Sequence, residues 1–270
     1  MITRSNIITD IKNTNTIAAI HDLEKFAKIK WGVEDIDLTG LDANAMQGTF
    51  AVMDRAIERY PELRGTVKSL KVTAMFETMT ANLHGSLRFD STDYANGNFE
   101  IAKQGYANYV ELGIYPTGTA LEDAGVHELG HMLEARLVKE RESDWTLQKV
   151  AWEKCKHARR ILDSALKRVN LNERDIAKGV RNAFPMIAQG SDDVLVGFYR
   201  GLSADVRRGI DIHSISKYAT ANASESFAEA FKDVVANGDN ASGLSKAIMR
   251  EYENYRREES LTCPCPCPLS

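Results

Sequence analysis

The chain has 270 residues, 43% of them hydrophobic, and a formal net charge of -4 at pH 7. This length and apolar content allow one or two domains with sizeable cores, while the acidic balance argues against binding nucleic acid by neutralising phosphates. No apolar run approaches the roughly 18 residues of a membrane span, and no signal-peptide pattern follows Met1. We therefore expect a cytoplasmic globular protein that binds neither nucleic acid nor membrane.

The first part of the chain predicts helices. Residues 1–13 carry no regular pattern, and we expect them to be disordered. Apolar residues at helical spacing then predict one helix over residues 14–30 and a second over 42–59, which ends before Pro61. We expect residues 1–62 to form an N-terminal helical region.

Strands are predicted next. Two stretches mix apolar and polar residues in the manner of strands, at Val67, Leu70, Val72 and Met75 and then at Leu83, Leu87 and Phe89. Further extended segments are predicted at residues 99–102 and 109–115. We expect a small mixed sheet that leads into the following helix.

That helix, predicted over residues 121–139, carries the sequence His127-Glu128-Leu129-Gly130-His131. Residues four apart lie on one face of a helix, so the two imidazoles can bind one metal ion. Zinc lowers the pKa of a bound water to about 7, and an adjacent carboxylate such as Glu128 can then take its proton. The other reading is an amphipathic helix that carries two histidines by chance, and its apolar stripe would be Val126, Leu129, Leu133 and Leu137.

A long helix is predicted over residues 144–169. Its apolar positions alternate steps of four and three, which indicates a packing seam, at Ala151, Cys155, Ala158, Leu162, Ala165 and Val169. We expect its basic residues to face solvent and His157 to be structural. Residues 172–209 predict only short helical or loop segments.

Two candidates exist for a third metal ligand. Glu153, on the long helix, would suit the arrangement of thermolysin. The second candidate is residues 216–231, where a helix would place Tyr218, Asn222, Glu225 and Glu229 on one polar stripe and Phe227, Ala230, Phe231 and Val234 on the opposite side. The competing interpretation of this stretch is a surface helix with its acids in water.

The HExxH segment, followed by Tyr218 and by Glu225-Ser226-Phe227-Ala228-Glu229-Ala230-Phe231, resembles the catalytic segments of the anthrax lethal factor family of zinc metallopeptidases. Related domains occur in phage minor head proteins and other mobile-element proteins. The resemblance covers residues 115–140 and 212–235. It implies that zinc is held by His127, His131 and Glu225, that Glu128 is the general base, that Tyr218 stabilises the oxyanion or protonates the leaving amine, and that Glu229 orients a ligand histidine.

The resemblance implies an α+β fold. We expect a zincin-like domain over residues 63–260, with a small mixed sheet, an active-site helix and a glutamate helix. His131 and Glu225 are further apart in sequence than in lethal factor itself, so we interpret residues 141–211 as a helical insertion. Residues 261–270, where three cysteines alternate with prolines, predict a flexible tail.

The implied function is a zinc-dependent metalloendopeptidase, whose polypeptide substrate lies along an exposed strand edge of the sheet. A different class of function is a phage or prophage structural protein that keeps the fold for assembly and has phage structural partners, in the virion. A third is an esterase or amidase that uses the same zinc site on a small molecule.

Overall fold

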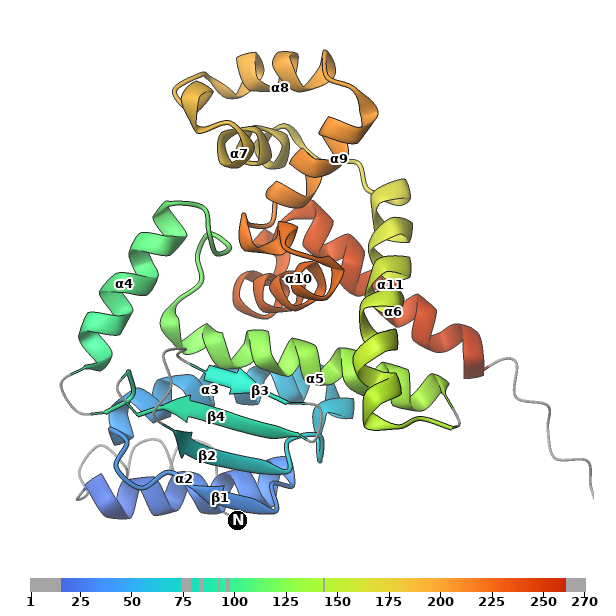
Figure 1. The fold of residues 1–270 in the computed structure, drawn as a ribbon. Helices are drawn as coiled ribbons and strands as arrows, with labels where there is room; N and C mark the ends of the chain where they lie inside the picture. Colours follow the sequence, from blue (N-terminus) through green and yellow to red (C-terminus); the bar gives the residue numbers. More distant parts are fainter. Residues whose placement is uncertain are drawn as a thin grey trace, which may run out of the picture. The chain divides into compact units, whose positions relative to one another are not determined.

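The computed structural model describes the chain with a few gaps (Figure 1), namely residues 16–73, 79–82, 85–91, 93–95, 98–142 and 144–260. The described residues are mostly helical and include a small mixed sheet of four strands, so the predicted α+β class is confirmed. The expected disorder of residues 1–13 and the expected tail at 261–270 lie outside the described residues. Among the described residues, no helix is both long and apolar enough to cross a membrane.

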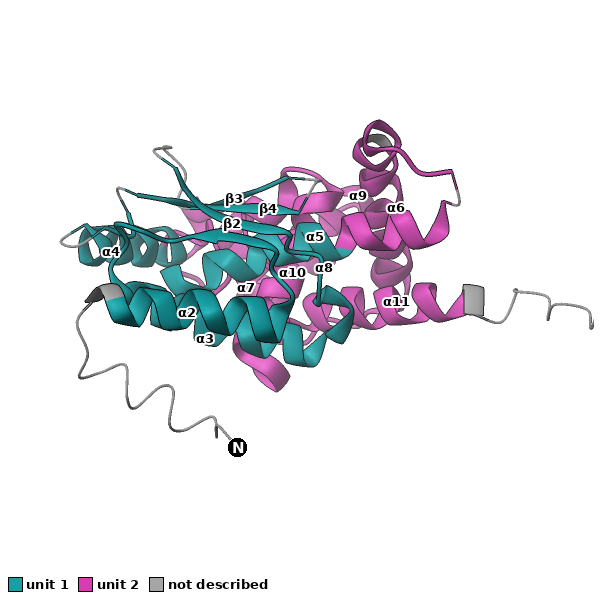
Figure 2. Ribbon diagram, turned by 90° about the horizontal axis from the view of Figure 1, so that it is seen from below, with its two compact units in different colours: residues 1–111, 119–133 teal, residues 112–118, 134–270 magenta. Residues whose placement is uncertain are grey.

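Two compact units make up the chain (Figure 2). The first comprises Met1–Glu111 and Thr119–Leu133, and the second comprises Leu112–Gly118 and Glu134–Ser270. The boundary therefore falls inside helix α5 (Ala124–Arg141), whose first ten residues belong to the first unit. The predicted ranges 1–62, 63–260 and 261–270 stay a prediction.

The sheet belongs to the first unit. Its strands lie in the order β1 (Asp35–Asp37), β2 (Ser69–Thr73), β4 (Ser86–Asp90) and β3 (Met79–Ala81). The pairs β1–β2 and β2–β4 are parallel, whereas β3 and β4 are antiparallel. Strands β2 and β4 confirm the two predicted strand stretches, although Met75 and Leu83 lie outside the described residues.

One face of this sheet is buried. Leu70 is in register with Ile36 on one side and with Leu87 on the other, and all three side chains are buried. Lys71 and Arg88, which are in register with each other, are exposed. This alternation is the pattern of a sheet that packs on one face only, and helices α2 and α3 lie on the buried face (Figures 1 and 2).

Helices α2 (Thr16–Trp31) and α3 (Ala43–Arg59) confirm the two predicted N-terminal helices. The side chain of Asp42 caps α3 by accepting a hydrogen bond from the Ala45 amide at 2.8 Å, which satisfies an N–H that has no partner within the helix. Asp54 accepts a hydrogen bond from the Trp31 indole at 3.0 Å, which joins the two helices. After α3, a 3-10 turn, η1, covers Pro61–Leu63.

The predicted extended segments at residues 99–102 and 109–115 are wrong. Helix α4 covers Phe99–Glu111. The aromatic residues favoured strands, but Phe99 and Tyr106 are seven positions apart and bury one side of a helix. Gly113, with φ of 69°, follows the helix in the left-handed conformation that commonly ends one.

The helices and 3-10 turns are the regular elements among the described residues of the second unit. One group consists of the long helices α6 (Leu147–Arg168), α10 (Ala223–Asn237) and α11 (Gly243–Ser260), which pack together. A smaller group consists of α7 (Glu173–Ala183), η3 (Pro185–Ile187), α8 (Asp192–Arg200) and α9 (Ala204–His213). Its buried core consists of Ala177, Val180, Leu195 and Ile210. Most of the described residues in 141–211 therefore lie in helices, and their interpretation as an insertion stays a prediction; the stretch 172–209 contains α7, α8 and the first part of α9.

Helix α6 confirms the predicted long helix, but part of its predicted seam is wrong. Ala158, Leu162 and Ala165 are buried, whereas Ala151 and Cys155 are exposed. In the first half of the helix the buried face passes through Val150 and His157 instead, and Thr146 caps the start by accepting from the Lys149 amide. The predicted spacing of four and three was correct. In the first turns of α6, however, the buried face is rotated around the helix relative to the predicted seam. The basic residues predicted to face solvent are exposed, apart from the half-buried Lys154.

Candidate functional site

Helix α5 is held by packing along most of its length. It follows a 3-10 turn, η2 (Leu121–Asp123), in which Asp123 accepts a hydrogen bond from the Ala120 amide at 2.6 Å. At Gly125 a Cβ atom would stand 2.9 Å from Met53 Sδ and 3.1 Å from Met79 Cε, so only glycine fits there without a shift of its neighbours. The four residues of the predicted apolar stripe are all buried, namely Val126, Leu129, Leu133 and Leu137.

The histidine pair lies on this helix within the first unit. The Nε2 atoms of His127 and His131 are 3.1 Å apart, and the two rings are nearly perpendicular at 86°. Two nitrogens bound to one tetrahedral zinc at about 2.0–2.1 Å are separated by roughly 3.3 Å. The pair therefore fits two ligand positions of such an ion. His127 is buried, while His131 and the intervening Glu128 are half-buried.

The glutamate segment lies in the second unit. Helix α10 begins after Asn222, whose side chain accepts a hydrogen bond from the Glu225 amide at 3.0 Å. Glu225 is therefore in the first turn of the helix and is half-buried. Its carboxylate is at the end of the helix where the backbone dipole favours negative charge.

The prediction that Tyr218 shares one helical stripe with Glu225 and Glu229 is wrong. Tyr218 lies in a separate 3-10 turn, η4 (Tyr218–Thr220), because the cap at Asn222 starts a new helix. Its amide donates to the carbonyl of Ile114 at 2.9 Å. The residue is 40% exposed.

The interpretation of residues 216–231 as a surface helix is also wrong, because α10 is buried on most sides. All four residues of its predicted apolar stripe are buried, and so are Ser224, Ser226, Glu229, Lys232 and Asp233. Small residues at many positions allow other helices to pack closely around it.

A buried ion pair lies on α10. Glu229 and Lys232 are 0% and 1% exposed, and the lysine Nζ is 2.6 Å from a carboxylate oxygen of Glu229. The Ser216 hydroxyl donates to the other oxygen at 3.0 Å. The same Nζ lies 4.5 Å from the ring centroid of Tyr115, which meets the ring of Tyr218 edge to face at 6.0 Å. The sequence did not reveal the roles of Lys232 and Tyr115, although the Glu-x-x-Lys spacing was visible.

A second buried contact joins α10 to the part of α5 within the second unit. The Ser224 hydroxyl donates to the carboxylate of Glu134, and both residues are almost fully buried. Sequence patterns did not point to this pair, since neither residue belongs to a recognisable motif.

Glu153, the other candidate ligand, lies on α6. Its carboxylate is 2.8 Å from the ammonium of Lys156. It also belongs to a cluster with Glu142 and His157, whose ligand atoms all lie within 4.8 Å of one another, so this group could hold a metal ion.

No protein-family model, curated protein or solved structure matches this chain. His127, Glu128 and His131 belong to the first unit, whereas Tyr218, Glu225 and Glu229 belong to the second. Their joint assignment as a zinc peptidase site stays a prediction.

Proposed function

We propose that the chain is a zinc-dependent metalloendopeptidase. The observation that carries this proposal is the 3.1 Å separation of the two Nε2 atoms on α5, which suits two ligands of one tetrahedral ion. A donor set of two imidazoles and one carboxylate is typical of catalytic zinc, with the fourth position open.

Glu225 is the proposed third ligand. His127, His131 and Glu134 are at positions i, i+4 and i+7 of α5, so they share one stripe of that helix. Glu134 accepts a hydrogen bond from Ser224, the residue immediately before Glu225. Within the second unit, the first turn of α10 thus contacts the residue that follows His131 on this stripe of α5, which supports a role for Glu225 over one for Glu153.

When bound, zinc would act as a Lewis acid on the scissile carbonyl and would lower the pKa of a water molecule at the open position. In our proposal, Glu128 takes the proton from that water and passes it to the leaving nitrogen. The Tyr218 hydroxyl donates a hydrogen bond to the oxyanion. Glu229 orients a ligand histidine, as a carboxylate behind a metal-bound imidazole commonly does.

The proposed substrate is an extended polypeptide that pairs with the edge of the sheet. Strand β3 is at one edge of the described sheet. Its residue Met79 lies against Gly125 near the start of α5, two positions before His127. A peptide added along β3 would therefore lie beside the start of α5, the helix that carries the histidine pair, and its main chain would supply most of the affinity.

Two measurements test the proposal. The first is digestion of a broad peptide library by the unaltered chain and by Glu128→Gln. We expect cleavage by the unaltered chain alone, and its loss when a chelator removes the metal. Equal results for the two proteins would contradict the proposal and favour the structural role.

The second measurement is bound zinc per chain. We expect Glu225→Ala to bind one zinc fewer than the unaltered chain, and Glu253→Ala to bind the same amount. Glu253 is a suitable control because it is an exposed acid on α11 that pairs with Arg257 one turn away. Equal zinc in Glu225→Ala and the unaltered chain would exclude Glu225 as a ligand.

A further inference from the structure

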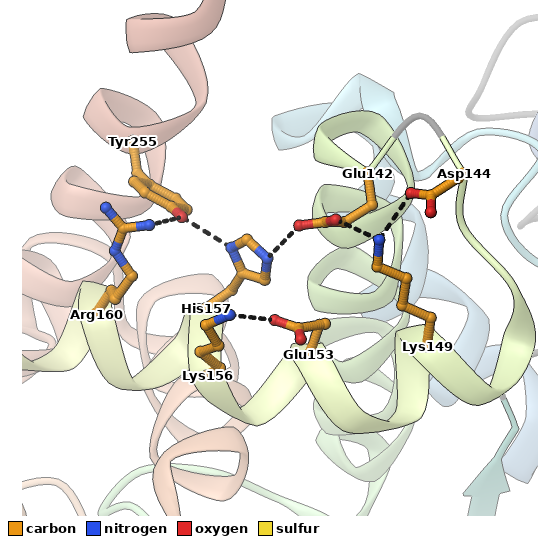
Figure 3. A network of polar contacts seen from close by, with 8 residues as sticks. All are labelled: Glu142, Asp144, Lys149, Glu153, Lys156, His157, Arg160 and Tyr255. Carbon is orange, nitrogen blue, oxygen red and sulfur yellow. Dashed lines mark hydrogen bonds and ion pairs between the residues drawn. The ribbon is translucent and has the colours of Figure 1, made fainter.

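A second group of ligand-type side chains lies entirely in the second unit (Figure 3). Glu142 follows the end of α5, and Glu153 and His157 are one turn apart on α6. Their ligand atoms lie within 4.8 Å of one another. None of these residues has a part in the proposed peptidase site.

The imidazole of His157 is buried and oriented. Its side chain is 7% exposed, and its Nδ1 lies 2.8 Å from the Tyr255 hydroxyl. Its Nε2 is buried with no hydrogen-bond partner among the described residues, and the nearest carboxylate oxygen of Glu142 is 3.7 Å away. A ring whose Nδ1–H donates to the tyrosine presents the lone pair of Nε2 to the two carboxylates. Burial lowers the pKa of His157.

Tyr255, on α11, is itself held in place. Its hydroxyl accepts a hydrogen bond from Arg160 at 3.1 Å (Figure 3). The guanidinium of Arg141 lies over its ring and donates to its backbone carbonyl. A tyrosine fixed from both sides limits rotation of the imidazole, as the partners of metal-bound histidines commonly do.

The two carboxylates are paired with flexible lysines. Lys149 lies 2.7 Å from Glu142, and Lys156 lies 2.8 Å from Glu153. The lysine side chains are 32% and 67% exposed, so each ammonium can move into solvent when a cation takes its place. The 3.7 Å between Glu142 and His157 is close to the roughly 3.3 Å expected for two ligands of tetrahedral zinc.

We propose that Glu142, Glu153 and His157 form a second binding site for a divalent transition metal of the zinc class. One nitrogen and two carboxylate oxygens are ligands that zinc accepts, with water in the fourth position. The bound ion joins the end of α5 to α6, and through Tyr255 it is coupled to α11. It thereby stabilises the packing of these three helices.

The test uses Zn²⁺ alone as the probe and the full chain stripped of metal. The histidine pair on α5 is removed first, in the variant His127→Ala/His131→Ala, so the result does not depend on the proposed peptidase site. We expect this double variant to bind one zinc per chain and to unfold at a higher temperature when zinc is present.

Adding Glu153→Gln to the double variant should weaken zinc binding at least about 10-fold, whereas Glu253→Gln should leave it unchanged. A folded double variant that binds no zinc would overturn the proposal. So would zinc binding that is equally tight with and without Glu153→Gln.

Lys149→Met gives an independent test, because this lysine competes with the metal for Glu142. Made both in the double variant and in the unaltered chain, it should tighten zinc binding at this site. A network of ion pairs that never binds metal predicts no such gain, so unchanged or weaker binding would also overturn the proposal.

Discussion

Helix α10 and helix α6 are both parts of the second unit, yet they differ in whether their polar residues are buried or exposed. On α10, Glu229, Lys232 and Asp233 are buried and partnered. On α6, most of the charged residues are in solvent, and Arg159 is an example. Helix α5 resembles α10, because it buries His127 and Glu134.

The difference shows where polar residues affect the free energy of unfolding most. A buried charge is tolerated only with a partner, and removing one partner costs several kcal/mol. An exposed ion pair contributes about 0–1 kcal/mol. Helices α5 and α10, which carry the proposed site residues, thus contain buried polar groups whose burial reduces the free energy of unfolding. Most of the polar groups of α6 are at the surface, where they favour solubility, and the cluster around His157 is the exception.

Glu128→Gln tests whether the polar groups of α5 serve catalysis. We expect kcat/KM for peptide cleavage to fall by about 10²- to 10⁴-fold, because the general base is lost. Folding should be preserved, since glutamine has the same shape. Glu140→Gln, on an exposed position of the same helix, should retain full activity. Steady-state kinetics measure kcat/KM for both variants. Equal values for Glu128→Gln and Glu140→Gln would contradict a catalytic role for the polar groups of α5.

Lys232→Met tests the buried ion pair of α10. We expect the free energy of unfolding to fall by about 3–5 kcal/mol, because the Glu229 carboxylate would remain buried without its ammonium. The same substitution at the exposed Lys167 on α6 should change it by less than about 0.5 kcal/mol. Denaturant titration of both variants gives the values, and a loss under about 1 kcal/mol at Lys232 would show that the pair is not desolvated as described.

Ser224→Ala removes the hydroxyl that donates to Glu134. The expected loss is about 1–3 kcal/mol, because a buried carboxylate oxygen loses its donor. Ser164→Ala on α6, at a half-buried position, is the matched control, with an expected change within about 0.5 kcal/mol. If the two variants proved equally stable, the contact between α5 and α10 would not contribute as proposed.

Arg159→Ala on α6 is expected to have the smallest effect. The guanidinium is 4.0 Å from Asp163, and its side chain is 68% exposed. We expect a change within about 0.5 kcal/mol by thermal or denaturant unfolding. A clearly larger loss would mean that the exposed face of α6 has a structural role.

Local signals predicted much of this structure. Helical spacing gave α2, α3, α5 and α6, and the position of Pro61 marked the end of α3. Helix α4 was not predicted, because the preference of its aromatic residues for strands was given more weight than the seven-residue spacing of Phe99 and Tyr106. The cap at Asn222 was not anticipated, so Tyr218 was placed on the wrong element.

Among the candidate site residues, too, some features follow from local sequence patterns and others depend on packing between helices. The convergence of His127 and His131 follows from helix geometry alone, so the sequence was sufficient. The burial of Glu229 and Lys232 depends on the helices that surround α10, which no local pattern specifies. The cluster around His157 joins residues on three elements, and for that reason the sequence suggested only a structural histidine.

The central claim is that His127, His131 and Glu225 hold one zinc ion. The most direct test is a crystal structure of the chain grown with zinc, with diffraction recorded at the zinc absorption edge. Our account predicts an anomalous peak about 2.0–2.2 Å from both imidazole Nε2 atoms and from a carboxylate oxygen of Glu225. A structure without zinc at the histidine pair, or with zinc there and Glu225 out of reach, would contradict it.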